Sequence, residues 1–365
     1  MRSNLKFRKS DNVRFFDTVK TRINEHFESR NISKKANWTM VSKTLLFLSL
    51  TVIFYVSLLF GGFPLYVNFL LAAGLGSSMA FIGFNVCHDA LHGAYSSKPW
   101  KNHLLGWLFN IIGANAYIWK ITHNQIHHTY TNIVGHDADL EVAPGMIRIH
   151  AEEELKPVHK YQHIYAFFLY SLSSLSWFYR KDYIKFFGRT IGRGGHSHPK
   201  SEVYKLFLYK GLYYVLFLVL PFLVMDHAWW QILLVLLVMN LVEGTVMGNV
   251  FQLAHLVELT SMPNPHEEAT MEDSWAVHQM KTTANFARES KLVCYLVGGL
   301  NFQIEHHLFP NVCHVHYPEI SKIVQATAKE FGLPYHESPT FFSAFGSHVR
   351  FLKQMGRPVS SGEIK

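Results

Sequence analysis

Hydrophobic residues are concentrated in four long runs along the chain. A helix needs about 20 apolar residues to cross the hydrocarbon core of a bilayer, and the runs lie near 43–60, 65–86, 206–225 and 228–250. Four residues, Gly61 to Pro64, separate the first two runs, and only Asp226 and His227 separate the last two. The pattern predicts an all-α integral membrane protein with four transmembrane helices in two hairpins.

Two shorter apolar segments, 103–119 and 161–179, are different in kind. Both are rich in Gly, Asn, Ser and aromatic residues, and both are short for a membrane span. We interpret them as helices that lie in the membrane interface or dip into the cytoplasmic leaflet. If 103–119 crossed the membrane, the histidines before it and those after it would lie on opposite sides and could not form one metal site.

The charge distribution predicts the orientation of the chain. Residues 1–43 carry 11 Lys and Arg against 4 Asp and Glu, whereas the short connections within the two hairpins carry no Lys or Arg. The positive-inside rule places the N-terminus in the cytoplasm. Because each hairpin crosses and returns, residues 87–205, residues 251–365 and the C-terminus are expected on the same side, as a cytoplasmic helical cap. We expect no cleavable signal peptide, since residues 1–40 have no apolar core.

Composition supports a membrane protein and argues against nucleic acid as a partner. Hydrophobic residues make up 49% of the 365 residues and charged residues 16%, below the roughly 25% charged residues of an average soluble domain. The net charge is +8, but the basic residues collect beside the apolar runs, which favours anionic lipid headgroups. Three cysteines are too few and too scattered for a disulfide framework.

The chain contains 23 histidines, and their spacing suggests a metal site. About one or two His-x3-His pairs are expected by chance at this content, and about 0.1 His-x3-His-His triplets. Three pairs occur, His88/His92, His123/His127 and His159/His163, and one triplet, completed by His128. A second adjacent pair, His306-His307, follows the second hairpin.

The positions of these histidines indicate a shared site. His88 and His92 follow the second apolar run directly, and His255 follows the fourth. Residues four apart share a helix face, whereas neighbours diverge by about 100°, so adjacent pairs can serve two metal ions. Imidazole binds Fe, Zn, Cu or Ni, and spacing does not choose among them. We interpret His159/His163 as a structural pair, because no neighbouring cluster supports it.

Three segments resemble the histidine boxes of membrane fatty acid desaturases, namely 88–92 (HDALH), 123–128 (HNQIHH) and 303–307 (QIEHH). A glutamine opening the third box resembles the front-end, linoleoyl-CoA or delta-6-like subgroup. The resemblance implies a desaturase domain over 41–335, between a basic N-terminal segment (1–40) and a C-terminal tail (336–365). It also implies a di-iron centre with the ligands His88, His92, His123, His127, His128, His255, Gln303, His306 and His307.

The resemblance further implies an O2-dependent enzyme that introduces a cis double bond into a fatty acyl chain carried as acyl-CoA or acyl-lipid. Residues 1–40 are too short for a fused cytochrome b5 domain, so a separate electron donor, ferredoxin or cytochrome b5, is expected. The alternatives are a membrane di-iron lipid hydroxylase and a histidine-rich metal transporter, for which only Glu243 provides an ionisable group inside a span. The candidate acceptors that would orient the imidazoles are Asp89, Asp137, Asp139 and Glu305.

Overall fold

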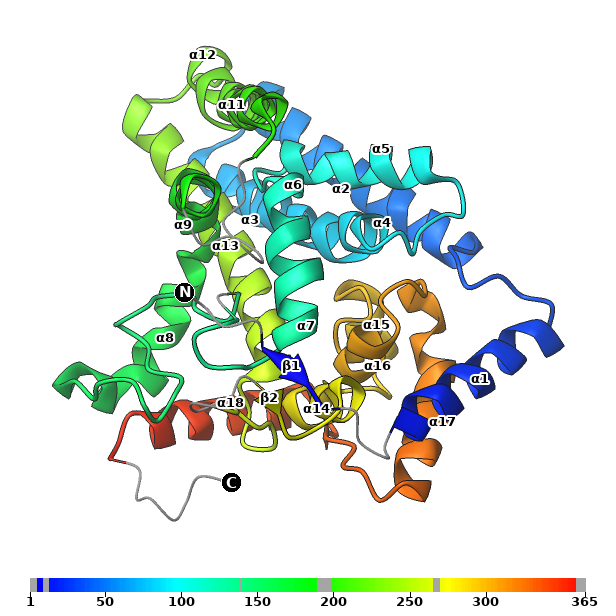
Figure 1. Cartoon of the computed structure of the whole chain (residues 1–365). Coiled ribbons are helices and arrows are strands. Elements are labelled where there is room, and N and C mark those ends of the chain that lie inside the picture. The colour runs from blue at the N-terminus through cyan, green and yellow to red at the C-terminus, as the bar shows by residue number, and fades with distance from the viewer. Residues whose placement is uncertain (1–4, 9–12, 138, 189–197, 265–269, 359–365) are drawn as a thin grey trace. The chain divides into compact units, whose positions relative to one another are not determined.

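The computed structural model of the chain describes residues 5–8, 13–137, 139–188, 198–264 and 270–358 (Figure 1). The chain divides into two compact units. Unit 1 comprises residues 1–36, 122–167 and 250–365, and unit 2 comprises residues 37–121 and 168–249. Both units are therefore assembled from segments that are far apart in the sequence.

Within the residues that the structure describes, four helices are long and apolar enough to cross a membrane, as the sequence predicted. They are Trp38–Phe60, Leu65–Leu91, Lys200–Val224 and Trp229–His255. By element, these are α2 (Trp38–Phe60); α3 (Leu65–Ile82), the π-helical turn η1 (Gly83–Cys87) and α4 (His88–Leu91); α11 (Lys200–Tyr214), η5 (Val215–Val219) and α12 (Leu220–Val224); and α13 (Trp229–His255).

These helices begin earlier or end later than the apolar runs, because polar residues extend them. Helix α2 begins where the Asn37 side chain accepts a hydrogen bond from the Met40 backbone N–H at 3.1 Å, which is the function of an N-cap. The α2 and α3 helices of unit 2 contact each other through Thr51, which donates to Ser78 at 2.9 Å. Gly76 brings α3 close to α13, since a Cβ there would lie 2.2 Å from the Met239 carbonyl oxygen.

The remaining helices of unit 2 are short. The segment expected as one helix over 103–119 is broken at Gly113, whose φ of 105° is in the region that favours glycine. The second segment, 161–179, likewise contains several helical pieces rather than one. The bounds are α5 (Pro99–Ile111), α6 (Ala116–Trp119), α9 (Ser173–Ser176), η4 (Trp177–Lys181) and α10 (Asp182–Phe187), with α8 (Gln162–Ser171) at the boundary of the units.

Unit 1 surrounds an apolar core to which α1 (Val13–Ser29) contributes one face. Phe15, Val19, Ile23 and Phe27 of α1 are buried and pack with residues of α17 (Tyr317–Glu330), and Figure 1 shows these two helices side by side. Two short parallel strand pairs join distant segments: β1 (Lys6–Phe7) with β2 (Thr270–Met271), and β3 (Asn285–Phe286) with β4 (Glu337–Ser338).

The other elements of unit 1 carry or support the histidine boxes. They are η2 (Lys120–His127), α7 (His128–Tyr130), η3 (Pro157–Tyr161), α14 (Trp275–Thr282), α15 (Lys291–Leu296), α16 (Gln303–Leu308), η6 (His314–His316) and α18 (Phe341–Met355). The segment expected as a C-terminal tail thus contains β4 and α18, whose residues Ala344, Phe351 and Leu352 are buried.

Candidate metal centre

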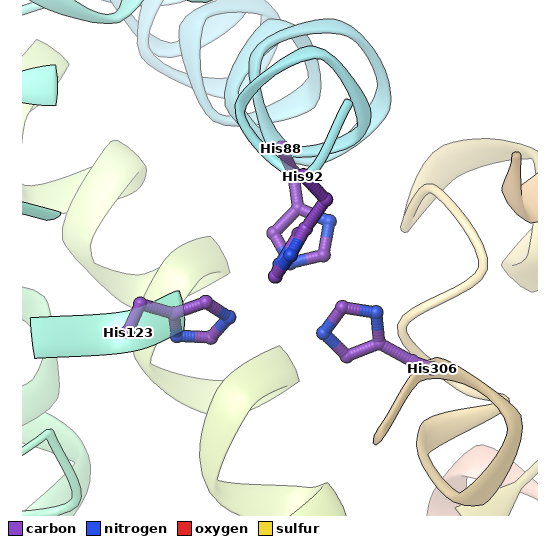
Figure 2. Close-up of side chains that lie close together, drawn as sticks. All are labelled: His88, His92, His123 and His306. Atoms are coloured by element: carbon purple, nitrogen blue, oxygen red, sulfur yellow. The ribbon is translucent and has the colours of Figure 1, made fainter. Parts of the chain in front are cut away.

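The first histidine box lies at the end of a long helix of unit 2. The π-helical turn η1 immediately precedes His88, and such turns recur at functional sites because they insert an extra residue into the helix. The His88 and His92 rings are 4.7 Å apart between centroids. Figure 2 shows them projecting side by side from one helix. Each ring also lies 5.5 Å from the Trp119 ring.

The second box lies on η2 and α7 of unit 1. The sequence predicted an α-helix here, whereas residues Lys120–His127 form a π-helix. The rings of His123 and His127 nevertheless stack at 5.0 Å between centroids. The adjacent rings of His127 and His128 are nearly perpendicular, with an interplanar angle of 84°.

The third box forms the short helix α16, whose first turn is fixed by Asn285. The Asn285 side-chain oxygen accepts a hydrogen bond from the Ile304 backbone N–H at 3.0 Å. The rings of His306 and His307 are likewise nearly perpendicular, with ring planes at 87°. Figure 2 includes His306 and the second-box His123, whose rings stack 6.0 Å apart within unit 1.

Six histidines of unit 1 therefore converge from three segments of the chain. Two triads are close enough for metal binding, His127/His255/His307 and His128/His306/His307, and within each the ligand atoms lie within 4.8 Å of one another. Groups with this spacing could hold one metal ion each, with bonds to imidazole nitrogen of about 2.0–2.1 Å in the case of zinc. His307 belongs to both triads, so the two groups lie next to each other, and its one ligand nitrogen would bind an ion of either triad.

Four of these imidazoles have a partner on their Nδ1 side, which for His306 is the Tyr317 hydroxyl at 3.3 Å. His127 donates to an Asp137 carboxylate oxygen at 2.8 Å, and the Nδ1 of His123 lies 3.5 Å from Asp139. The expectation that Asp137 and Asp139 face the imidazoles is confirmed. An acceptor at Nδ1 fixes the tautomer and leaves the Nε2 lone pair for a metal ion.

The third acceptor, Gln279, was not expected from the sequence. Its Oε1 accepts a hydrogen bond from Nδ1 of His307 at 2.7 Å and another from the Thr131 hydroxyl at 2.8 Å. Gln279 belongs to α14, in which Trp275 donates to the His128 carbonyl oxygen at 2.9 Å. Helix α14 thus supports both the second and third boxes, and no motif spacing linked it to either.

Gln303 lies within the cluster that its position in the third box suggested. Its Nε2 is 2.9 Å from Nε2 of His255 and 3.2 Å from Nε2 of His307. Rotation of the amide about its terminal bond exchanges the nitrogen for Oε1, which is an atom that can bind a metal ion. Phe251, one turn before His255, places its ring 5.2 Å from the His255 ring.

The carboxyl group of Glu305 faces away from the imidazoles. It accepts hydrogen bonds from the Tyr335 hydroxyl and the Asn285 amide, both at 2.8 Å. Burial raises the pKa of Glu305 to about 7, although both hydrogen bonds lower it. The expectation that Glu305 orients a histidine is therefore wrong: it anchors α16 to β3 and to the segment before β4. Asp89, the remaining candidate, is buried in unit 2.

Burial also keeps the His123 imidazole neutral. It lowers the pKa of His123 to about 4, against the opposing influence of Asp139. A neutral imidazole has a nitrogen lone pair to donate at pH 7. His159, by contrast, uses both ring nitrogens on backbone groups, at 3.1 Å from the Lys156 nitrogen and 3.3 Å from the Gly145 oxygen. This agrees with its interpretation as a structural residue.

Comparison with known proteins agrees with this geometry. Residues 64–339 match the family model described as "Fatty acid desaturase". The chain is 33% identical to the sn-1 linoleoyl-lipid 6-desaturase of Arthrospira platensis, covering 94% of this chain and 93% of that protein. It is 33% identical to the protein of the same name from Synechocystis sp., covering 94% and 96%.

A relative outside this pair matches over a similar length. The chain is 32% identical to the acyl-lipid (8-3)-desaturase of Physcomitrium patens, covering 97% of this chain and 74% of that protein. The family model alone spans well over half of the chain. The chain therefore belongs to the fatty acid desaturase family and is an oxidoreductase that introduces a double bond into a fatty acyl chain.

Proposed function

We propose that this enzyme binds two iron ions through its histidine boxes and desaturates acyl chains of membrane lipids that already contain double bonds. The observation that carries the proposal is the convergence of six buried histidines of unit 1: five of them form two triads that share His307, and the ring of the sixth, His123, stacks on that of His127. The remaining ligands would be His88 and His92 of the first box and Gln303. Figure 2 draws four members of this ligand set.

The reaction favours iron among the metals that imidazole binds. Desaturation removes two hydrogen atoms and is an oxidation, and zinc has no redox chemistry. When bound, the iron pair supplies the redox chemistry with O2, in which two electrons from the substrate and two from a donor protein yield two waters. The donor would be a separate ferredoxin or cytochrome b5.

The chain's own contribution is to orient the ligands and exclude water. Asp137, Asp139 and Gln279 hold the Nδ1 side of three imidazoles and direct the other nitrogen inward. The proposed ligands are buried except for the half-buried His92, and His127, His255 and His307 are fully buried. A dry site protects a reactive oxidant from side reactions, and oriented ligands hold the metal ions in a fixed geometry.

We infer the substrate class from the names of the relatives. Two of them are named as linoleoyl-lipid 6-desaturases and one as an acyl-lipid (8-3)-desaturase. We therefore assign this enzyme an acyl chain esterified in a lipid, with the new double bond on the carboxyl side of existing ones. The glutamine that opens the third box, Gln303, is consistent with this front-end type.

The membrane topology completes the proposal. The four long helices would cross the bilayer as two hairpins, with both termini and the metal site on the cytoplasmic side. The excess of basic residues in segment 1–43 and the short connections at 61–64 and 226–227 support this orientation. A membrane-embedded substrate can then diffuse to the site laterally, while the soluble electron donor approaches from the cytoplasm.

Expression in a host without polyunsaturated lipids tests the function. Cells supplied with linoleate and a working electron donor should form a lipid-linked fatty acid with one additional double bond, located by mass spectrometry of derivatised chains. His127→Ala should abolish the product, and His159→Ala, a matched change outside the cluster, should retain it. A hydroxylated chain, or no modified chain with any supplied fatty acid, contradicts the proposal.

A further inference from the structure

A row of aromatic rings extends from the first histidine box into unit 2. The Trp119 ring contacts both His88 and His92. Phe109 lies 5.5 Å from Trp119 between ring centroids, and Trp177 lies 5.6 Å from Phe109, both edge to face. Because an acyl chain must bring two neighbouring methylenes beside the proposed ligands, it passes close to the start of this row.

The row offers the surface that an acyl chain requires. Trp119 and Phe109 are buried within unit 2, which also contains long apolar helices, and Trp177 is half-buried. Aromatic rings present large apolar faces with little conformational freedom. A rigid surface of this kind can hold a flexible chain in one register.

The orientation of Trp177 is fixed by a buried ion pair. Its indole N–H donates to one carboxylate oxygen of Asp182 at 2.9 Å. The other carboxylate oxygen accepts from the Lys210 ammonium at 2.7 Å and from the Asn115 backbone N–H at 2.8 Å. Lys210 also donates to the carbonyl oxygens of Gly113 and Phe178, at 2.6 and 2.9 Å.

A buried ion pair is unusual in a long apolar helix such as the one that carries Lys210. Lys210 lies in a helix that is long and apolar enough to span a membrane, so the expectation that Glu243 is the only ionisable group inside a span is wrong. A charged side chain at such a position is costly unless it is paired, and it marks a functional region. All three donors of the ammonium group have acceptors, and both oxygens of Asp182 have donors. The pair therefore joins α11, the turn at Gly113 and the π-helical turn η4 around one indole ring.

We propose that Trp177 is a specificity-determining residue that contacts the acyl chain and sets the position of the new double bond, with Asp182 and Lys210 as the positioning residues that hold its indole ring. The inference rests on the proposed function. Trp177 is two rings away from the proposed ligands, so its replacement should shift the substrate without removing a metal ion. Trp119 is less suitable for this test, because it contacts His88 and His92 directly and its replacement could disturb the metal ligands.

The test measures the ratio of positional isomers formed from linoleate. Trp177→Phe retains an aromatic ring but removes the hydrogen bond to Asp182 and part of the apolar surface. A change of this size in an apolar pocket alters discrimination by about 10- to 200-fold, so the ratio of isomers should change at least about tenfold. Trp229→Phe is the matched control, since Trp229 is 68% exposed on a long helix of the same unit.

This readout separates positioning from folding. The isomer ratio does not depend on the amount of folded enzyme, whereas a structural defect lowers the yield of all isomers together. Asp182→Asn should shift the ratio in the same direction as Trp177→Phe. An unchanged ratio in both variants overturns the inference, even where the yield falls. No new double bond from the unchanged enzyme contradicts the proposed function instead.

Discussion

The Nδ1 atom of His307 donates a hydrogen bond to the side-chain oxygen of Gln279 over 2.7 Å. His307 is the histidine common to both triads of unit 1, so its orientation affects both proposed metal positions. Gln279 is itself held by the Thr131 hydroxyl and by its amide nitrogen, 3.3 Å from the His128 carbonyl oxygen. One amide side chain thus connects the second and third histidine boxes.

Gln279→Leu should therefore weaken metal binding without removing a ligand. Loss of such an outer partner costs about 10- to 100-fold in metal affinity or activity, because the ring rotates and its tautomer is no longer fixed. The measurement is iron content per chain after dialysis at graded iron concentrations. Gln354→Leu, at an exposed position on α18, is the matched control, and equal iron content in the two variants contradicts the assigned role.

Asp137→Asn and Asp139→Asn should differ in effect. Asp137 bonds His127 at 2.8 Å and also accepts the Asn132 backbone N–H at 3.0 Å, whereas Asp139 lies 3.5 Å from His123. The shorter contact orients its ring more firmly, and the carboxylate stabilises the Nδ1–H tautomer more than an amide does. We expect a larger loss of iron and turnover from Asp137→Asn, measured on the same preparations. The reverse order would show that the longer contact controls the site.

The long helices and the histidine cluster were predictable because their signals are local. An apolar run of about 20 residues predicts a membrane-spanning helix by its length alone. The division of His127 and His128 between two triads follows from the rotation between neighbours in a helix. The buried face of α1 also has a local signal, since Phe15, Val19, Ile23 and Phe27 recur every four residues.

Other parts of the site depend on tertiary packing and left no local signal. Gln279 reaches His307 across 28 residues, and nothing in its own segment marks that contact. Glu305 sits between two box residues, yet its side chain points to Asn285 and Tyr335. The sequence did not predict the π-helix over Lys120–His127. Histidines spaced four residues apart are typical of an α-helix, and the extra residue per turn of a π-helix depends on tertiary packing.

Lys210→Met should strongly destabilise the enzyme. It leaves the Asp182 carboxylate buried without its cation, and breaking a buried pair costs about 3–5 kcal/mol. Lys205→Met on the same helix provides the control, since Lys205 pairs with Glu202 at 2.7 Å but its side chain is 48% exposed. The midpoint of thermal aggregation in detergent should fall for Lys210→Met and change little for Lys205→Met. Similar midpoints would mean that the pair contributes no more than a surface contact.

Stability should also fall in mild acid because of buried histidines outside the cluster. Burial lowers the pKa of His348 to about 4, and its ring Nδ1 donates to the Leu256 carbonyl oxygen. In the unfolded chain the pKa returns to about 6.5, so between pH 6.5 and 4 the unfolded state binds the additional proton. The stabilisation is complete above pH 6.5 and decreases as the pH falls, by at most about 1.4 kcal/mol per pH unit for one group.

His348→Gln isolates this contribution, since glutamine retains a donor for the Leu256 carbonyl oxygen but does not titrate. Between pH 7 and 5 the thermal midpoint of the variant should fall less steeply than that of the unchanged enzyme. The slope will not vanish, because burial also lowers the pKa of His278 to about 4. His103→Gln, at an exposed position on α5, should leave the slope unchanged. Parallel slopes for all three proteins would exclude His348 as a source of acid sensitivity.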